Sequence, residues 1–297
     1  MAEICPVMNT QRLLLATDGS EYSEGAVREA ITLAKRCSST LSAISVIETN
    51  PEYETIAPQL LERSEKAAWV ILEAVKARAK SAEVDCQISV HEGEDSYHYI
   101  ADAAAKDKIS MIVMGRRGRK GIKRLAMGST TARVIGHSPC NVLVVPKAAQ
   151  IGFKSIVVAT DGSRYSAAAA AEAIGIAKQN KSELTIISVV PAELMTPTDI
   201  DFTMNQRELI AEKEMHEAEK NAKLVKEAAL KEGVPAKAFV MSGRPADAII
   251  ETANEKKADL IVVGSHGRTG LERLLMGSVA ERVIVLASSA VLVVKGK

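Results

Sequence analysis

The sequence predicts an α/β fold made of two tandem doubly wound domains, each a five-stranded parallel sheet flanked by helices. Three observations lead to this prediction. The chain of 297 residues is about two domains long, and its second half repeats its first. Within each half, short apolar segments alternate with longer amphipathic ones. We place the domains at residues 1–149 and 150–297.

The repeat extends through both halves. RLLLATDGSEYSEGAVREAITLAK from Arg12 matches SIVVATDGSRYSAAAAAEAIGIAK from Ser155, and CNVLVVPK matches SAVLVVKG near the two ends. Early blocks are offset by 143 residues and late blocks by 149, so the second half carries six extra residues in its middle. The joining segment PKAAQIGFK leaves little room for a flexible linker. We therefore expect the two halves to lie close together.

Five apolar, β-rich runs in the first half are candidate strands: Leu13–Ala16, Leu41–Ile47, Val84–Val90, Ile109–Met114 and Val142–Val145. The first, fourth and fifth are apolar almost throughout, which is typical of strands buried on both faces of a parallel sheet. Small and apolar residues recur at three- and four-residue spacing over Leu60–Ala79, which predicts one face of a helix. Its counterpart spans about Met204–Lys231 and ends before Gly233 and Pro235, as a helix stop should.

Glycine recurs at fixed spacing directly after the fourth predicted strand of each half. Both copies read G-x2-G-x9-G-S: Gly115, Gly118, Gly128 and Ser129 in the first, and Gly264, Gly267, Gly277 and Ser278 in the second. Glycine permits positive φ and lets backbone N–H groups approach an anion. Each serine is expected to be the N-cap of the next helix, with Glu281 completing a capping box in the second copy. Because a helix N-terminus is an anion site, the motif predicts a bound phosphate chain.

An aspartate follows the first predicted strand of each half, within the sequence ATDGS. These residues are Asp18 and Asp161. Ligands of open α/β sheets bind at the carboxyl ends of the strands, where the strand order reverses. If the order is 3-2-1-4-5, Asp18 faces the loop of Gly115 and Asp161 faces the loop of Gly264. The alternative is that both aspartates only cap the following helix.

Phosphate contacts alone are too weak for tight binding. A helix N-terminus contributes about 0.3–2 kcal/mol to an anion and a charge-assisted hydrogen bond about 1.5–3 kcal/mol, whereas micromolar affinity requires about 8 kcal/mol. Burial of an apolar ring, at about 25 cal/mol per Å², can supply the difference. Val46 and Val189, near the ends of the second strands, offer a wall for such a ring, although both also fit as core residues. Phosphates together with a flat ring indicate a nucleotide.

The glycine spacing after the fourth strand, with D-G-S after the first, resembles the universal stress protein family in its tandem form. The resemblance covers nearly the whole chain, and the glycines are similar to those of the ATP-binding members. It implies Rossmann-like domains and two ATP sites. The residues implied for them are Asp18, Val46, Gly115, Gly118, Gly128 and Ser129 in the first half, and Asp161, Val189, Gly264, Gly267, Gly277 and Ser278 in the second.

The resemblance also implies how the halves associate and what else they bind. The last strands, VLVVP and VLVVK, would pair across the halves and make an internal pseudo-dimer. AMP or ADP are alternatives to ATP, and Mg²⁺ could accompany the nucleotide. A further homodimer and an unknown protein partner remain open.

The two glycine loops differ in charge. Arg116-Arg117 in the first copy replaces Ser265-His266 of the second, and six of the nine residues from Arg116 to Arg124 are basic. Extra positive charge would favour phosphate, or the long side chains would fill the site. Because the long side chains could fill the first site, we expect the second site to bind the nucleotide better. The alternative reading of the basic run is a solvated surface.

Three functional classes follow from the sequence. The first is an ATP-binding stress protein that senses or signals and is not a dedicated enzyme, because no Walker lysine motif, G-x-S-x-G or metal-ligand cluster occurs. We expect no catalytic residues and no metal ligands. The second is slow ATP hydrolysis, with Mg²⁺ on the phosphates and Asp161 near the metal. The third is a nucleotide-free protein that only binds a partner.

Composition excludes other partners and suggests a compartment. A net charge of +1 and only 3% aromatic residues argue against nucleic acid. No apolar run reaches the roughly 18 residues of a membrane span, and the N-terminus does not read as a secretion signal. Four cysteines, Cys5, Cys37, Cys86 and Cys140, lack metal-site spacing and are expected to be reduced, which predicts a cytoplasmic protein.

Overall fold

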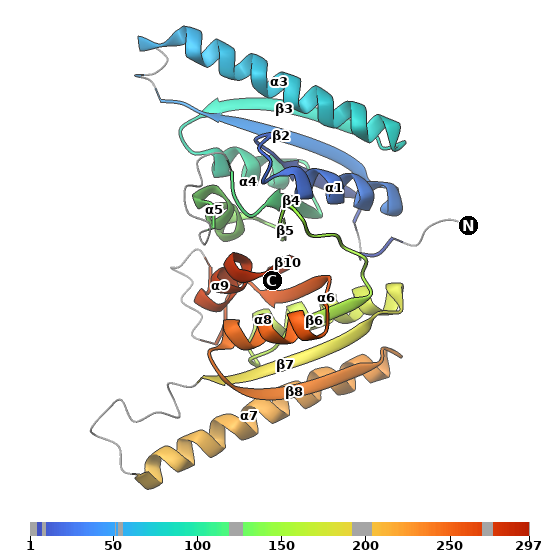
Figure 1. Ribbon diagram of the computed structural model, residues 1–297, viewed down its shortest axis with the longest axis vertical. Coiled ribbons are helices and arrows are strands. Elements are labelled where there is room, and N and C mark those ends of the chain that lie inside the picture. The colour runs from blue at the N-terminus through green and yellow to red at the C-terminus, as the bar shows by residue number, and fades with distance from the viewer. Residues whose placement is uncertain are drawn as a thin grey trace. The chain divides into compact units, whose positions relative to one another are not determined.

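The protein, for which we have a computed structural model, is described over residues 5–7, 10–50, 52, 56–118, 127–191, 204–268 and 276–296. For residues 204–207 the description covers the backbone only. The chain divides into two compact units, Met1–Gln150 and Ile151–Lys297. Each unit contains parallel strands with helices packed against them (Figure 1).

The first unit holds five parallel strands in the order β3-β2-β1-β4-β5, as predicted. The reversal of order lies between β1 and β4, which are neighbours although two strands separate them in the chain. The elements are β1 (Arg12–Ala16), α1 (Glu24–Cys37), β2 (Thr40–Glu48), α3 (Pro58–Ser81), β3 (Cys86–Gly93), α4 (Ser96–Lys106), β4 (Met111–Gly115), α5 (Ser129–His137) and β5 (Asn141–Val145).

The second unit repeats this topology with the strand order β8-β7-β6-β9-β10. Numbered within the unit, this is again 3-2-1-4-5. The elements are β6 (Ser155–Ala159), α6 (Arg164–Asn180), β7 (Glu183–Pro191), α7 (Met204–Lys231), β8 (Ala236–Gly243), α8 (Pro245–Glu255), β9 (Leu260–Gly264), α9 (Ser278–Leu286) and β10 (Ala290–Val294).

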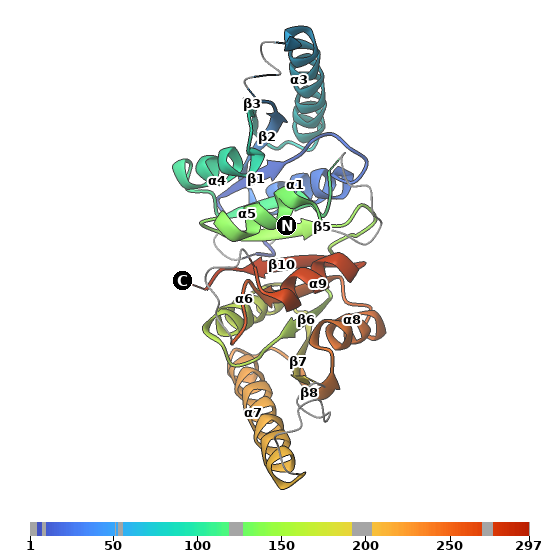
Figure 2. The same ribbon diagram turned by 90° about the vertical axis from the view of Figure 1, so that its left-hand side faces the viewer.

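Helices cover both faces of the strands in each unit. In the first unit α1 and α3 contact each other on one face, while α4 and α5 contact each other on the other (Figure 2). In the second unit α6 pairs with α7 and α8 with α9 in the same way. Right-handed crossovers produce this division, because the chain first runs outward from β1 to β3 and then returns past β1 to β4. The carboxyl ends of β1 and β4 therefore lie side by side where ligands of such folds bind.

Aliphatic side chains fill the space between strands and helices. Leu15, Ile112 and Ile135 are among the largest fully buried side chains of the first unit. All five residues of β4 are buried, as its continuous apolar run predicts. The edge strand β3 is only partly buried, because it has a neighbour on one side within this unit.

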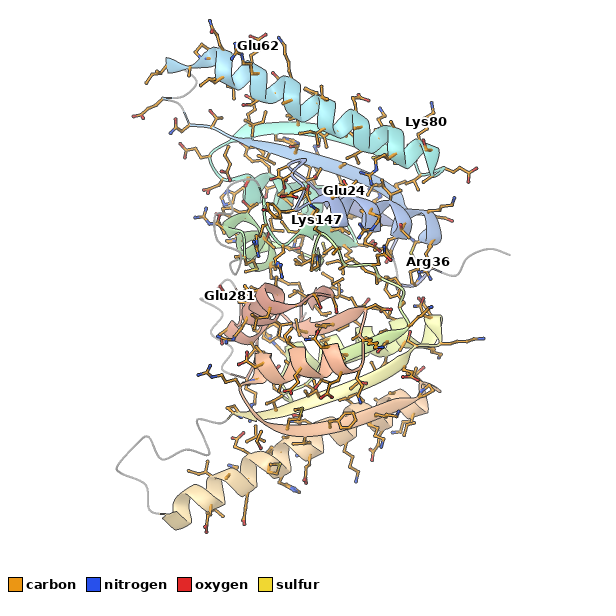
Figure 3. All side chains as sticks on the ribbon, viewed as in Figure 1. Glu24, Arg36, Glu62, Lys80, Lys147 and Glu281 are labelled. Atoms are coloured by element: carbon orange, nitrogen blue, oxygen red, sulfur yellow. A yellow bond between two sulfur atoms is a disulfide. The ribbon has the colours of Figure 1, made fainter. Side chains whose placement is uncertain are left out.

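The helix predicted over Leu60–Ala79 is α3, and its apolar face packs only in part. Leu72 is fully buried, whereas Leu60 is 55% exposed, so the N-terminal part of the face has no cover among the described residues. Glu62 and Lys80 mark the two ends of the helix in Figure 3. None of the helices in the described ranges is both long enough and apolar enough to cross a lipid bilayer.

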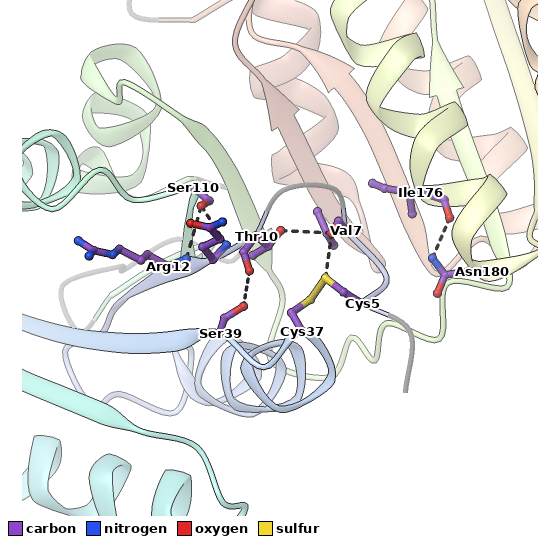
Figure 4. Close-up of a disulfide and its surroundings, with 10 residues drawn as sticks. Cys5, Val7, Thr10, Arg12, Cys37, Ser39, Ser110, Ile176 and Asn180 are labelled. Atoms are coloured by element: carbon purple, nitrogen blue, oxygen red, sulfur yellow. Dashed lines mark hydrogen bonds between the residues drawn. A yellow bond between two sulfur atoms is a disulfide. The ribbon is translucent and has the colours of Figure 1, made fainter. Parts of the chain in front are cut away.

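The expectation of four reduced cysteines is wrong for Cys5 and Cys37. They form a disulfide, with Cα atoms 4.1 Å apart, between the N-terminal segment and the last residue of α1 (Figure 4). The Ser39 hydroxyl donates to the carbonyl of Thr10, which holds the same segment at the start of β2. The sequence could not predict the pair, because a separation of 32 residues says nothing about two Cα positions in the fold.

Cys86 and Cys140 are free thiols, as predicted. Burial, and secondly the charge of Asp85, raise the pKa of Cys86 to about 11. The thiolate is the reactive form, so Cys86 should react with iodoacetamide at pH 8 about 100-fold more slowly than an ordinary exposed thiol. Mass spectrometry of timed alkylation should show the rate rising with pH up to about pH 11. Rapid labelling of the folded protein at pH 8 would contradict this assignment.

Candidate functional site

The aspartate after β1 lies against the glycine segment after β4. β1 and β4 run parallel as neighbours, so their carboxyl ends meet. A Cβ atom added at Gly118 would lie 2.8 Å from Oδ2 of Asp18. The other oxygen, Oδ1, accepts hydrogen bonds from the Ser20 amide at 3.0 Å and the Ser20 hydroxyl at 2.7 Å. The predicted position of Asp18 beside this loop is confirmed.

The second copy repeats the arrangement with Asp161 and Gly267. A Cβ atom at Gly267 would lie 2.8 Å from Oδ2 of Asp161. That oxygen accepts a hydrogen bond from the Arg268 amide at 3.0 Å, and Oδ1 accepts one from the Ser163 amide at 3.0 Å. Asp161 thus connects two loops through their main chains. Its predicted position beside the second glycine loop is also confirmed.

The alternative in which the aspartates cap the following helix is wrong. The N-cap of α1 is Ser23, and the N-cap of α6 is Ser163, whose hydroxyl accepts from the Ser166 amide at 3.2 Å. Asp18 and Asp161 come too early in the chain for this role, since both precede the turn that leads into the helix. Their carboxylates hold the turn itself.

The expected positive φ occurs in the D-G-S turns and not in the glycine loops. Gly19 and Gly162 have φ of +70° and +80°. Among the described residues of the glycine motif, none has a positive φ. For Gly115 the structure shows another reason for glycine, which is the absence of a Cβ atom. A Cβ at Gly115 would lie 2.8 Å from the Tyr22 carbonyl oxygen.

Gly264 has the same environment as Gly115. A Cβ there would lie 2.7 Å from the carbonyl carbon of Tyr165. Tyr22 and Tyr165 occupy equivalent places in the repeat, so both glycines let the entry to α1 or α6 approach the end of a strand. The structure thus gives these two glycines a packing role that does not depend on a ligand.

The N-caps of α5 and α9 are glycines, and the expectation for Ser129 and Ser278 is wrong by one residue. Gly128 and Gly277 have extended backbones (φ −65° and −69°), and the following serine is the first helical residue. The Gly277 carbonyl accepts from the Glu281 amide at 3.0 Å, so no serine–glutamate capping box forms in the described structure. A cap without a side chain leaves the first-turn amides of the helix accessible.

Gly128 is less crowded than Gly115. A Cβ on Gly128 would lie 3.4 Å from the Cα of Arg117 and 3.5 Å from Oγ1 of Thr131, which are ordinary contacts. Gly277 is somewhat tighter, at 3.2 Å from the Cα of His266. The protein itself therefore has room for a methyl group at Gly128. Packing does not explain why this position is glycine.

A cavity of about 580 Å³ opens at the carboxyl ends of β1, β2 and β4 in the first unit. Its volume is in the range of about 300–1,000 Å³ that small-molecule sites occupy. Every residue predicted for the first site lines it: Asp18, Val46, Gly115, Gly118, Gly128 and Ser129. Its lining combines apolar residues, among them Ile44, Val46 and Met114, with polar residues such as Asp18 and Ser129. Val46 is half-buried, as a residue shared between core and cavity should be.

The cavity also contains residues that the sequence reasoning missed. Glu48 ends β2, Ser96 begins α4 and Thr130 lies in the first turn of α5, and all three line the cavity. Ser96 donates to Oε1 of Glu48 at 3.0 Å, and its oxygen lies 3.1 Å from Oγ1 of Thr130. No repeated motif marks them, because their counterparts in the second half are Pro191, Pro245 and Val279.

In the second unit the predicted residues come from equivalent elements. Asp161 and Gly267 lie together, the Gly277 amide donates to the Ser265 carbonyl at 2.8 Å, and Ser278 begins α9. Val189 is half-buried near the end of β7. The expectation that this second site is the more competent one stays a prediction.

Arg116 and Arg117 do not fill the first site. The Arg117 guanidinium lies over the Tyr22 ring, with Cζ 5.9 Å from the centroid, and the residue lines the cavity wall. Burial, and secondly the charge of Arg117, lower the pKa of Arg116. In the second unit His266 takes the equivalent place, 5.0 Å from the ring of Tyr165.

Part of the predicted loops is outside the described residues. These parts include Gly121, Gly270 and most of the basic run from Arg116 to Arg124. Within the described ranges, no group of three or more histidine, cysteine, aspartate or glutamate side chains could hold a metal ion.

With the fold and the glycine loops in place, comparison with known proteins identifies the class. The sequence model of the universal stress protein family matches the chain twice, at residues 9–146 and 152–295. The protein belongs to the universal stress protein family, in a tandem form with two such domains in one chain.

Single-domain relatives match about half of the chain. A universal stress protein of Methanocaldococcus jannaschii is 46% identical over 143 residues, which cover 48% of this chain and 82% of the relative. The universal stress protein YxiE of Bacillus subtilis is 34% identical over 147 residues, covering 48% of this chain and 99% of the relative.

Solved structures share the fold over the whole chain. A universal stress protein from Archaeoglobus fulgidus superimposes with a TM-score of 0.74 and covers 98% of each chain at 23% identity. A universal stress protein from Pseudomonas aeruginosa gives a TM-score of 0.66, with coverage of 97% of this chain and 94% of that one at 19% identity. At these identities the likeness shows the fold alone.

Proposed function

We propose that each half binds an adenine nucleotide, ATP, and that the protein acts in a stress response through its nucleotide-bound state. The observation that carries the proposal is the cavity of the first half. It joins a glycine-capped helix N-terminus to an apolar wall within one volume of about 580 Å³. A ligand that fits both ends has an anionic group and a flat apolar ring.

The phosphates would lie at the start of α5. The amides of the first helical turn have no partners within the helix, and the helix dipole adds attraction for an anion. Gly128 lacks a side chain that would cover these amides, and Ser129 adds a hydroxyl at the same place. Arg117, which lines the cavity, brings a positive charge to the same wall.

The base would lie against the apolar wall at the end of β2. Ile44 and Val46 of β2 form this wall, Met114 of β4 lies on the other side of Ala16 of β1, and Ile71 of α3 lines the cavity as well. Burial of a ring the size of an aromatic side chain removes about 150–250 Å² from water. At about 25 cal/mol per Å² this contributes roughly 4–6 kcal/mol, about half or more of what micromolar binding requires.

Sensing or signalling is favoured over hydrolysis. Both carboxylate oxygens of Asp161 already accept hydrogen bonds from main-chain amides, which fits a residue that fixes two loops better than one that holds Mg²⁺. If Mg²⁺ binds, its ligands would be phosphate oxygens and water. AMP and ADP fit the same two ends of the cavity with fewer phosphate contacts.

Three further parts of the proposal stay predictions: pairing of the last strands of the two halves, a homodimer or protein partner, and a cytoplasmic location. The disulfide between Cys5 and Cys37 removes part of the support for the last of these, because such bonds are rare in reducing compartments.

The variant Gly128→Ala tests the phosphate role directly. The backbone of Gly128 suits alanine, and the added methyl group would make only ordinary protein contacts, so the fold should be unchanged. A bound phosphate, in contrast, would meet the methyl group. We expect the affinity of the first half for ATP to fall about tenfold or more in calorimetric titration.

Two measurements support the interpretation of this variant. Its thermal unfolding should show at most the small loss, about 1 kcal/mol or less, that alanine causes relative to glycine at an N-cap. ATP binding by the second half should persist. Denaturing the purified wild-type protein and identifying any released small molecule tests for a nucleotide independently. The proposal would be wrong if Gly128→Ala binds ATP with unchanged affinity and the wild type releases no nucleotide.

A further inference from the structure

We infer that Glu48 recognises the sugar hydroxyls of the nucleotide in the first half, and that the second half lacks this recognition. The inference rests on the proposed nucleotide function and names what selects the sugar. It follows from the hydrogen-bonded chain of Glu48, Ser96 and Thr130 across the cavity wall.

The hydrogen-bonding directions in this chain can be assigned. Each hydroxyl carries one proton. The Ser96 hydroxyl donates its proton to Oε1 of Glu48 at 3.0 Å, so at the 3.1 Å contact the Thr130 hydroxyl must be the donor to Ser96. The chain therefore runs from Thr130 through Ser96 and ends on the carboxylate. Glu48 is fixed as an acceptor by residues from two other elements.

The position of Glu48 corresponds to that of a sugar. Val46 and Glu48 are two residues apart on β2, so their side chains leave the strand on the same side. Val46 belongs to the apolar wall proposed for the base. At the other end, Thr130 follows Ser129 at the start of α5, where the phosphates are proposed to bind. Glu48 is thus connected to both ends, to Val46 along β2 and to Thr130 through Ser96, as the sugar is connected to base and phosphates in a nucleotide.

The chemistry of the carboxylate suits hydroxyl donors. A carboxylate has about four lone-pair positions, so a carboxylate that accepts from Ser96 can accept from several donors at once. Sugar hydroxyls are donors, whereas phosphate oxygens are acceptors and would be repelled. In the dinucleotide-binding Rossmann fold an acidic residue likewise hydrogen-bonds a ribose hydroxyl. Glu48 is an exposed residue of the cavity wall, which places the carboxylate within reach of a ligand.

The second half has no counterpart of this hydrogen-bonded chain. In the repeat, Glu48 corresponds to Pro191, Ser96 to Pro245 and Thr130 to Val279. None of these three side chains has a hydrogen-bonding group. The halves should therefore differ in their response to the sugar, although both keep the glycine motif.

The test compares ATP with 2′,3′-dideoxy-ATP, which lacks both sugar hydroxyls, by calorimetric titration of the full-length chain. The second site is closed by Gly267→Val, since a Cβ at Gly267 would lie 2.8 Å from Asp161. In this parent we expect ATP to bind about tenfold more tightly than the dideoxy analogue. Glu48→Ala should remove that preference by weakening ATP alone.

Two further variants separate recognition from general electrostatics. Glu94→Ala removes the same charge from an exposed residue outside the cavity wall and should keep the preference. Ser96→Ala should reduce the preference without abolishing binding, because Ser96 is a positioning residue that acts through Glu48. A purely structural role for Ser96 would weaken both ligands equally.

Other outcomes overturn the inference in distinguishable ways. If Glu48→Ala tightens both ligands, the carboxylate only repels phosphate. If it weakens both equally in the presence of Mg²⁺ but not in its absence, the carboxylate holds a cation. A parent that binds ATP and its dideoxy analogue equally refutes sugar recognition while the proposed function stands. A parent that binds neither ligand refutes both.

Discussion

Loss of the Cys5–Cys37 disulfide should lower the free energy of unfolding of the first half by about 3–4 kcal/mol. The bond closes a loop between residues 32 positions apart, and this magnitude is the loop-closure entropy that such a cross-link removes from the unfolded chain. The closed loop contains β1, the D-G-S turn and α1, so the disulfide stabilises the segment that carries Asp18. Chemical denaturation with and without a reductant measures the change.

The chain provides its own controls for this measurement. All four cysteines are in the first half, so unfolding of the second half should not respond to reductant. The double variant Cys5→Ser/Cys37→Ser should match the reduced wild type and should not respond either. Equal stability of the oxidised and reduced wild type would show that the bond contributes nothing to the free energy of unfolding.

Replacing Gly115 by alanine should destabilise the first half by about 1–3 kcal/mol. The new Cβ would lie 2.8 Å from the Tyr22 carbonyl oxygen and 3.1 Å from the Cα of Ser23. Both are main-chain atoms at the entry to α1 and cannot rotate away. Overpacking of this kind forces the backbone to shift, which has the stated magnitude. The midpoint of denaturant unfolding reports the loss.

Gly128→Ala is the matched control, because it adds the same methyl group at a position where the nearest atoms lie 3.4 Å or more away. Its unfolding midpoint should fall much less, because alanine in place of glycine at an N-cap costs at most about 1 kcal/mol. If Gly115→Ala were as stable as Gly128→Ala, the close approach of Tyr22 would not be the reason for glycine at position 115. Together the two variants separate glycines required by the fold from glycines required by a ligand.

The sequence predicted the fold because the evidence for it is local and repeated. Continuous apolar runs such as Ile109–Met114 predicted buried parallel strands, and the aspartate and glycine motifs predicted which strands are neighbours. The observed pairing of β1 with β4 follows from the same reasoning. The sequence predicted a buried apolar face along α3 from Leu60 to Ala79, but only part of this face is buried. The spacing of apolar residues does not show how far the neighbouring elements extend along the helix.

The site was predicted less completely, for physical reasons that differ among residues. Ser129 was assigned as the N-cap because serine caps helices well. In the structure Gly128, which has an extended backbone, is the N-cap, and Ser129 is the first helical residue. Glu48 and Ser96 were missed because they are 48 residues apart in the chain and meet only through the fold. Motif reasoning follows what the two halves share, and this pair is present in one half only.

The bond between Asp161 and the Arg268 amide has a consequence for any anion that approaches the second loop. One of the loop's donors already serves a negative group of the chain itself, at 3.0 Å. A bound anion must either displace the Asp161 carboxylate from the Arg268 amide or bind only to the other hydrogen-bond donors of the loop. Removing the Asp161 carboxylate would make the Arg268 amide available to an anion. It would also remove the hydrogen bond that holds the Ser163 amide in the turn, so tighter anion binding would come with a less ordered turn.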